Sequence, residues 1–165
     1  MEYISLTVSK KRLLALCLFC MATLVWSCGG SSDKKVAVAD ANGVVNLVVN
    51  STDLMRYDTR ELRVSAGAKV ALTLNHTGTM GKKMMGHNLV ILKSGTRVDD
   101  FASRALDSPD TDYIPAGDEI LVHTRLLGGG ESDTITFDAP DKGSYLFICT
   151  FPGHYTMMRG SFIVE

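Results

Sequence analysis

The chain has 165 residues, of which 45% are apolar and 21% charged, and its formal net charge is -1. These values are ordinary for a globular domain and exclude a disordered main body, and the length allows a core that needs no disulfides. Beyond the first 27 residues, 14 basic and 17 acidic residues leave a net charge of -3, so we expect no nucleic acid among the partners.

The N-terminal segment has the layout of an export signal. A basic triplet at 10–12 precedes an apolar run over 13–26 that is too short for a comfortable membrane span. Residues 25–28 (VWSC) resemble a bacterial lipobox, which implies cleavage before Cys28 and acylation of its thiol. The competing interpretation is an ordinary secretory site beside an incidental cysteine. We predict a lipoprotein signal peptide over 1–27 and a membrane-anchored protein in the bacterial periplasm.

The segment after this signal has the composition of a linker. Residues 29–35 are rich in glycine, serine and charged residues, which is typical of a flexible tether. We predict a lipidated cysteine and tether over 28–43, followed by one domain over 44–165. Cys149 is the sole thiol of that domain, so it cannot form an internal disulfide, and an unpaired thiol in an oxidising compartment points to a role such as metal ligation.

The predicted domain divides into short β-type runs separated by Gly, Asn, Asp and Pro. The eight runs span 44–50, 61–65, 69–75, 87–93, 120–126, 133–138, 144–150 and 160–165. Alternation of apolar and polar residues in 69–75 predicts a strand with one buried face. Short strands at this spacing are typical of an antiparallel sandwich, and apolar residues at helical spacing over 98–106 predict one short helix packed on it.

The stretch C-T-F-P-G-H-Y-T-M-M over 149–158 carries the chemistry. It supplies a thiolate at Cys149, an imidazole at His154 and thioethers at its last two positions, and its Pro-Gly pair predicts a turn that swings the histidine back toward the cysteine. His87, at the head of another predicted strand, is the natural candidate for a second imidazole. Two His and one Cys with a weak axial Met form the coordination of blue-copper electron-transfer sites, so the pattern predicts copper.

Each of these residues also has a plainer interpretation. A lone cysteine on a strand is usually a small buried hydrophobe, and His87 by itself could be a surface imidazole. We expect no role in metal binding for His76 and His123. The loop methionines at 80, 84 and 85 could form a copper-delivery cluster, although we favour an apolar rim. The combined spacing of Cys149 and His154 favours ligation over the plainer interpretations.

Three segments resemble azurins of the cupredoxin, or type 1 blue-copper, family, in the same order along the chain. They are M-G-H-N at 85–88, the run over 120–127, and C-T-F-P-G-H through M-R-G over 149–160. The resemblance implies an all-β fold, an eight-stranded Greek-key β-sandwich of the cupredoxin type with one short helical insertion. The implied copper ligands are His87, Cys149 and His154, with Met158 as the axial thioether and the Gly86 carbonyl as a distant fifth contact.

The resemblance also implies a support for the site, and the chain departs from azurins in three places. Asn88 would brace the loop that carries Cys149. Neither cysteine of the azurin disulfide is present, Leu89 stands where azurins have a buried tryptophan, and the lipobox-like segment contrasts with soluble azurins. Because of this predicted anchor, we expect the partner to belong to a membrane electron-transfer chain.

The implied function is electron transport rather than enzyme catalysis, with single electrons passing through an exposed ring edge of His154. An uncharged patch around that edge would dock partners through Met55, Met85, Phe151, Pro152 and Met157. Expected partners of this monomeric protein are c-type cytochromes or copper oxidoreductases. Two alternatives stay open: a copper-storage or copper-delivery lipoprotein, and an enzyme that uses Cys149 as nucleophile with a histidine as base.

Overall fold

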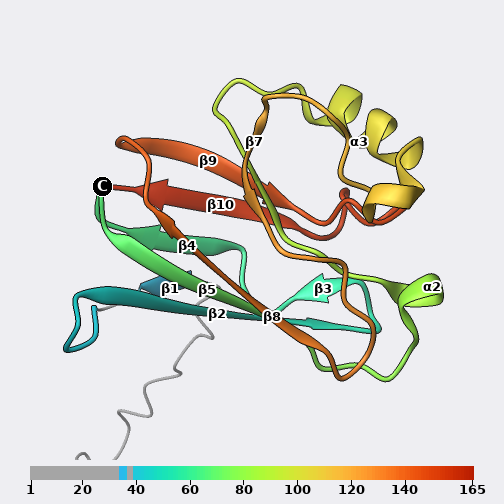
Figure 1. Ribbon diagram of the computed structural model, residues 1–165, viewed down its shortest axis with the longest axis horizontal. Coiled ribbons are helices and arrows are strands. Elements are labelled where there is room, and N and C mark those ends of the chain that lie inside the picture. The colour runs from blue at the N-terminus through green and yellow to red at the C-terminus, as the bar shows by residue number, and fades with distance from the viewer. Residues whose placement is uncertain (1–33, 37–38) are drawn as a thin grey trace, which may run out of the picture. The chain divides into compact units, whose positions relative to one another are not determined.

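The computed structural model describes residues 34–36 and 39–165, which build two β-sheets (Figure 1). The predicted signal peptide over 1–27 and the predicted lipidation site at Cys28 lie outside the described residues. The six-stranded sheet has the order β1 (Lys34–Val36), β4 (Glu61–Val64), β10 (Arg159–Val164), β9 (Gly143–Ile148), β6 (Val90–Leu92) and β7 (Ile120–His123). The four-stranded sheet has the order β3 (Arg56–Tyr57), β2 (Val44–Thr52), β5 (Lys69–His76) and β8 (Ser132–Asp138). The predicted all-β sandwich is confirmed.

The core lies between the two sheets and follows the alternation of the sequence. In β5, Val70, Leu72 and Leu74 are buried while the residues between them are half-buried. They pack with buried residues from both sheets, among them Leu47, Val49, Leu62, Leu89, Phe147 and Phe162. Burying a large apolar side chain stabilises the fold by about 1.5–3 kcal/mol, so this cluster is the main support of the sandwich.

The sandwich is mixed rather than purely antiparallel. β2 pairs in parallel with β5, with Leu47 opposite Leu72, and β10 pairs in parallel with β4. Alternation along one strand determines which face is buried but carries no information on the direction of the neighbouring strand. The expectation of an antiparallel sandwich was therefore wrong for these pairs.

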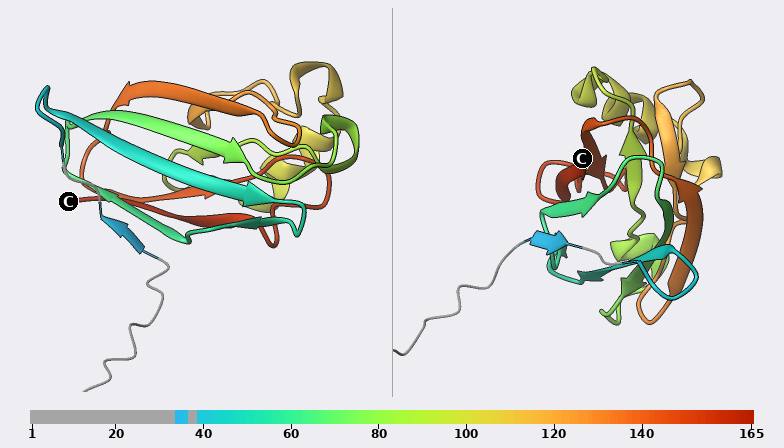
Figure 2. Two further views of the ribbon diagram at one scale, coloured as in Figure 1. Left: turned by 90° about the horizontal axis from the view of Figure 1, so that it is seen from below. Right: turned by 90° about the vertical axis from the view of Figure 1, so that its left-hand side faces the viewer.

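Helical segments gather at one end of the sandwich. α3 (Val98–Leu106) has the predicted bounds and buries Phe101, Ala102 and Ala105. Phe101 packs in one cluster with Val90 and Leu92 of β6. The short α2 (Lys82–Met85) and the 3-10 turn Pro109–Thr111 were not predicted. Figures 1 and 2 show α2, α3 and the β9–β10 connection at the same end, opposite the C terminus.

Several strands are shorter than predicted at this same end. β6 begins at Val90 rather than at His87, and β9 ends at Ile148 rather than at residue 150. His87 keeps a single bridge to Leu127. Cys149 follows β9 directly. The chain leaves the ladders at these points, which frees both side chains to turn toward one another.

Part of the predicted tether has regular structure. Residues Lys34–Val36 form β1, which pairs in parallel with β4. Asp40 then accepts hydrogen bonds from the backbone N–H groups of Asn42 at 2.8 Å and Val44 at 3.0 Å. Composition alone did not indicate this order, because the pairing partner of β1 lies in a distant part of the sequence.

Candidate metal centre

One group of metal-binding side chains stands out in the part of the chain that the structure describes. It consists of His87, Cys149 and His154, whose ligand atoms all lie within 4.8 Å of one another. The Sγ atom of Cys149 is 3.7 Å from Nδ1 of His154. All three residues are buried, at 0%, 0% and 3% exposure. His76 and His123 lie outside this group.

The loop 149–158 closes on itself through backbone hydrogen bonds. The N–H of Cys149 donates to the carbonyl of Met158 at 3.0 Å, and the N–H of Met158 donates to the carbonyl of His154 at 2.8 Å. Gly153 has a φ of 80°, a conformation that glycine adopts at little cost. The Pro-Gly turn therefore brings the imidazole back to the thiol, as the sequence predicted.

His87 reaches the same point from the segment just before β6, the strand that pairs with β9 in the larger sheet. Its N–H and C=O both pair with Leu127, at 3.0 and 2.8 Å. A Cβ added to Gly86 would come within 2.6 Å of the Lys82 carbonyl oxygen and 2.9 Å of the Phe151 ring. Only glycine fits before His87 in this packing, which explains the Gly-His pair seen in the sequence.

The tautomer of His87 is determined by one contact. Its Nε2 lies 2.9 Å from the carbonyl oxygen of Thr52 and must therefore carry the proton. Its Nδ1 is then an unprotonated lone pair, and this buried atom has no hydrogen-bond partner within the described residues. Burying such an atom unpaired costs about 1–3 kcal/mol, and a metal ion removes that cost. Two imidazoles and a thiolate are donors that suit copper, so the residues fit this ion.

Burial also determines the protonation states of the three donor side chains in the metal-free protein. It lowers the pKa of His87 to about 4 and the pKa of His154 to about 4, so both rings are neutral at physiological pH. It raises the pKa of the Cys149 thiol to about 11. Without metal the thiol keeps its proton, and binding of a metal ion releases it.

The two methionines at the end of the loop occupy different environments. Met158 is fully buried and packs in one apolar cluster with Leu126, Cys149 and Phe151. Met157 is 50% exposed. The Gly86 carbonyl oxygen accepts a contact from Sγ of Cys149 at 4.0 Å.

Asn88 joins the two segments that carry the ligands. Its Oδ1 accepts from the N–H of Thr150 at 2.8 Å, and its Nδ2 donates to the Thr150 hydroxyl at 2.7 Å and to the Asp112 carbonyl at 3.2 Å. The residue thus braces the loop of Cys149, as the resemblance to azurins implied. Partners like these orient metal ligands and limit their rearrangement.

Two neighbours of the site were missed by sequence reasoning. The ring of His76 lies 4.3 Å from that of His87, and its Nε2 is 2.8 Å from the Met85 carbonyl oxygen. The sequence contained a signal for the burial of His76, because this residue continues the alternation of buried positions in β5. The hydroxyl of Tyr57 donates to the Asn88 carbonyl at 2.5 Å, and no local pattern predicts this contact.

The residues predicted for docking differ in accessibility. Met55 is 37% exposed, Met85 and Pro152 are half-buried, and Phe151 is buried against the His154 ring, with centroids 4.7 Å apart. His154 itself is covered far more than expected. Packing of the Phe151 and His87 rings leaves little of its edge accessible. None of the described helices is long and apolar enough to cross a membrane.

Comparison with known proteins places this site in a family. Residues 43–165 match the model of the copper binding proteins of the plastocyanin/azurin family. The chain is 38% identical to azurin of Pseudomonas chlororaphis over 126 residues, which cover 71% of this chain and 95% of that one. It is 44% identical to outer membrane protein H.8 of Neisseria gonorrhoeae over 117 residues, or 68% of this chain, and spans only 63% of that protein.

Solved structures agree with these relatives. Reduced auracyanin from Roseiflexus castenholzii superposes with a TM-score of 0.67 and 32% identity, covering 78% of this chain and 99% of that one. Auracyanin A, a "blue" copper protein of Chloroflexus aurantiacus, gives a TM-score of 0.67 and 32% identity, covering 74% of this chain and all of that one (100%). With His87, Cys149 and His154 arranged as a copper site, the chain belongs to the plastocyanin/azurin family of copper-binding proteins.

Proposed function

We propose that the protein is a blue-copper electron carrier that moves single electrons between redox proteins outside the cytoplasm. The observation that carries this proposal is the unpartnered Nδ1 of His87, buried beside the Cys149 thiol and the His154 ring. Copper bound there supplies one-electron chemistry by alternating between its cuprous and cupric states. The relatives named as azurin and auracyanin support the same role.

The chain's own residues hold the donors in place and exclude water. His87 is oriented by Thr52, and the loop of Cys149 is braced by Asn88, so the donors need little rearrangement when the charge of the site changes. We assign the axial position to Met158, supported by its burial beside Cys149, and a distant contact to the Gly86 carbonyl.

Partners would dock over the loops that carry the ligands. We assign this surface to Met55, Met85, Phe151, Pro152 and Met157, of which Met55 and Met157 offer the most accessible apolar area. Phe151 supports it from beneath through its contact with His154. A small apolar contact suits brief encounters with a c-type cytochrome or a copper oxidoreductase.

We further propose that Cys28 carries a lipid anchor after removal of residues 1–27. The lipobox-like residues 25–28 support this assignment, and one relative is named as an outer membrane protein. Several acyl chains together hold a protein firmly at a membrane. Cys28→Ala should abolish incorporation of a labelled fatty acid and block processing, and label that persists in the variant would contradict the assignment.

A visible spectrum of the full-length protein, purified in a non-ionic detergent and loaded with cupric ion, tests the proposed function. We expect an intense blue band from thiolate-to-copper charge transfer, absent in Cys149→Ser, and fast electron self-exchange. Stoichiometric cupric ion without colour would contradict the proposal. Weak, exchangeable binding of cuprous ion alone would favour storage or delivery, and rapid alkylation of Cys149 would favour a nucleophilic enzyme.

A further inference from the structure

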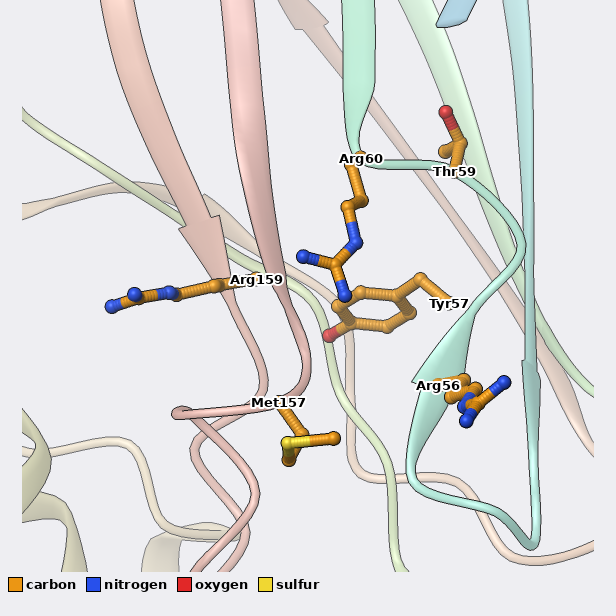
Figure 3. Close-up of a pocket in the computed structure, with 6 residues that line it drawn as sticks. All are labelled: Arg56, Tyr57, Thr59, Arg60, Met157 and Arg159. Atoms are coloured by element: carbon orange, nitrogen blue, oxygen red, sulfur yellow. The ribbon is translucent and has the colours of Figure 1, made fainter. Parts of the chain in front are cut away.

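A pocket of about 320 Å³ lies beside the loop 149–158 and has a cationic lining (Figure 3). It is lined by Arg56, Tyr57, Thr59, Arg60, Met157 and Arg159, three arginines with no acidic residue among them. The register of the larger sheet brings two of these arginines together. Ser161 of β10 pairs with Glu61 of β4, and the Ser161 N–H donates to the Arg60 carbonyl at 2.8 Å. Arg60 therefore lies next to the first residues of β10, where Arg159 stands.

These arginines differ from the others that the structure describes. Arg63, Arg97, Arg104 and Arg125 each form an ion pair with a carboxylate. Arg56, Arg60 and Arg159 are exposed and form no ion pair or side-chain hydrogen bond within the described residues. The chain beyond residue 27, these three arginines included, has a net charge of -3, so this surface is a local concentration of unpaired positive charge. Such a surface attracts an anionic partner.

The pocket shares one wall with the metal centre. Tyr57 lines the pocket and also packs against the apolar cluster that contains Cys149 and Met158. Met157, the other contact with the loop, immediately precedes Met158 and is 50% exposed. A partner seated on the arginines would therefore lie within one side chain of the copper site, which is a useful position for electron transfer.

The arrangement of the arginines favours a broad partner over a small anion. In Figure 3, Arg56 and Arg159 extend on opposite sides of Tyr57, with the Arg60 guanidinium group between them. The three groups thus spread over the surface instead of converging on a single point. A planar guanidinium group pairs well with a carboxylate through two parallel hydrogen bonds. Three separated groups match several carboxylates on a protein surface.

We propose that Arg56, Arg60 and Arg159 form a docking site for an acidic redox protein, which would contact Met157 at the same time. This inference rests on the proposed electron-carrier function and adds the charge of the partner. Complementary charges raise association rates and set the orientation of the complex, while the apolar contact keeps it short-lived. The chain thereby combines a cationic docking site with the uncharged patch that contains Met157.

Two forms of one cytochrome provide the test: a lysine-rich, basic c-type cytochrome and the same cytochrome after succinylation of its lysines. The copper-loaded full-length protein in detergent is reduced and mixed with each ferric cytochrome in a stopped-flow instrument, where each turnover moves one electron from copper to haem. At low salt, the variant R56Q/R60Q/R159Q should reduce the succinylated form about tenfold more slowly than the unmodified protein. Its rate with the basic form should not fall.

The matched control removes the same charge elsewhere. Lys69 and Arg97 are exposed ion-pair residues, and Lys142 lies in the turn between β8 and β9. The variant K69Q/R97Q/K142Q should keep most of the rate with the succinylated cytochrome. High salt should remove the difference between the unmodified protein and the arginine variant, because screening weakens contacts between exposed charges.

Equal losses in the two triple variants, or no loss in the arginine variant, would overturn the docking site. The proposed function fails separately, if the protein shows no blue band and reduces neither cytochrome. A lipid-facing role is also distinguishable. In detergent, the unmodified protein and the arginine variant would then reduce the cytochromes at equal rates. In carrier vesicles, replacing phosphatidylcholine with phosphatidylglycerol would slow the reaction of the unmodified protein but not that of the arginine variant. This pair of results would overturn the proposal.

Discussion

Asn88 and Thr150 exchange two hydrogen bonds just beyond the paired strands β6 and β9, at 2.8 and 2.7 Å, and so join the segment of His87 to the loop of Cys149. Both residues are buried, at 0% and 3% exposure, so water cannot replace a lost partner. The pair is therefore a structural support of the metal centre as well as of the fold.

Asn88→Ala should destabilise the metal-free protein by about 2–4 kcal/mol, because it leaves the Thr150 N–H without its partner and removes a second buried bond. Denaturant unfolding monitored by circular dichroism measures the loss. Thr134→Val is the control, since its hydroxyl bond to Thr73 at 2.8 Å lies on the exposed face. Equal effects of the two substitutions would show that the brace adds no stability.

Met158→Leu should raise the reduction potential of the copper protein and retain the blue band, because loss of a weak thioether donor disfavours the cupric state. The swap nearly conserves volume, so unfolding free energy should fall by less than about 1.5 kcal/mol. Cyclic voltammetry measures the potential. Met157→Leu is the matched control, and a shift in that variant alone would reverse the assignment of the axial ligand.

Asp53 should make the fold sensitive to acid. Hydrogen bonds from the backbone N–H of Thr79 above all, then from that of Met80, hold the pKa of its carboxyl below the ordinary value, although burial opposes the shift. A depressed pKa in the folded state means that the contribution to stability is complete above the unfolded pKa of about 3.9 and is lost as pH falls through the folded value.

Asp53→Asn should therefore lower stability at neutral pH and flatten the fall in stability below about pH 4. Denaturant unfolding of the metal-free protein across this range measures both effects. Asp141→Asn is the control, because the Asp141 side chain is exposed and makes no hydrogen bond within the described residues. An unchanged acid profile in Asp53→Asn would refute the role of this carboxylate.

Met157→Lys should slow electron self-exchange by an order of magnitude or more while leaving the blue spectrum nearly intact. A charge in the docking contact has to be desolvated, at a cost of about 1–3 kcal/mol, and each 1.4 kcal/mol is tenfold in affinity. Nuclear magnetic resonance line broadening in mixtures of the two oxidation states measures the rate. Lys142→Glu, on the turn before β9, should change it little, and the reverse result would place the docking surface elsewhere.

Local sequence information was sufficient for most elements of the fold. Alternation in β5 predicted its buried face, and apolar spacing predicted the exact bounds of α3. The spacing within 149–158 predicted that a thiol and an imidazole meet, because a Pro-Gly turn acts over a few residues. Such patterns report on the conformation of one segment at a time.

The tertiary structure alone decided which distant segments meet. The parallel pairing of β4 with β10 places Arg60 next to Arg159, and the packing of β5 on the site sets His76 against His87. These contacts depend on the register and direction of strands far apart in the chain, which result from the packing of the whole core. No short window of sequence contains that information, so the arginine pocket became visible only in the folded molecule.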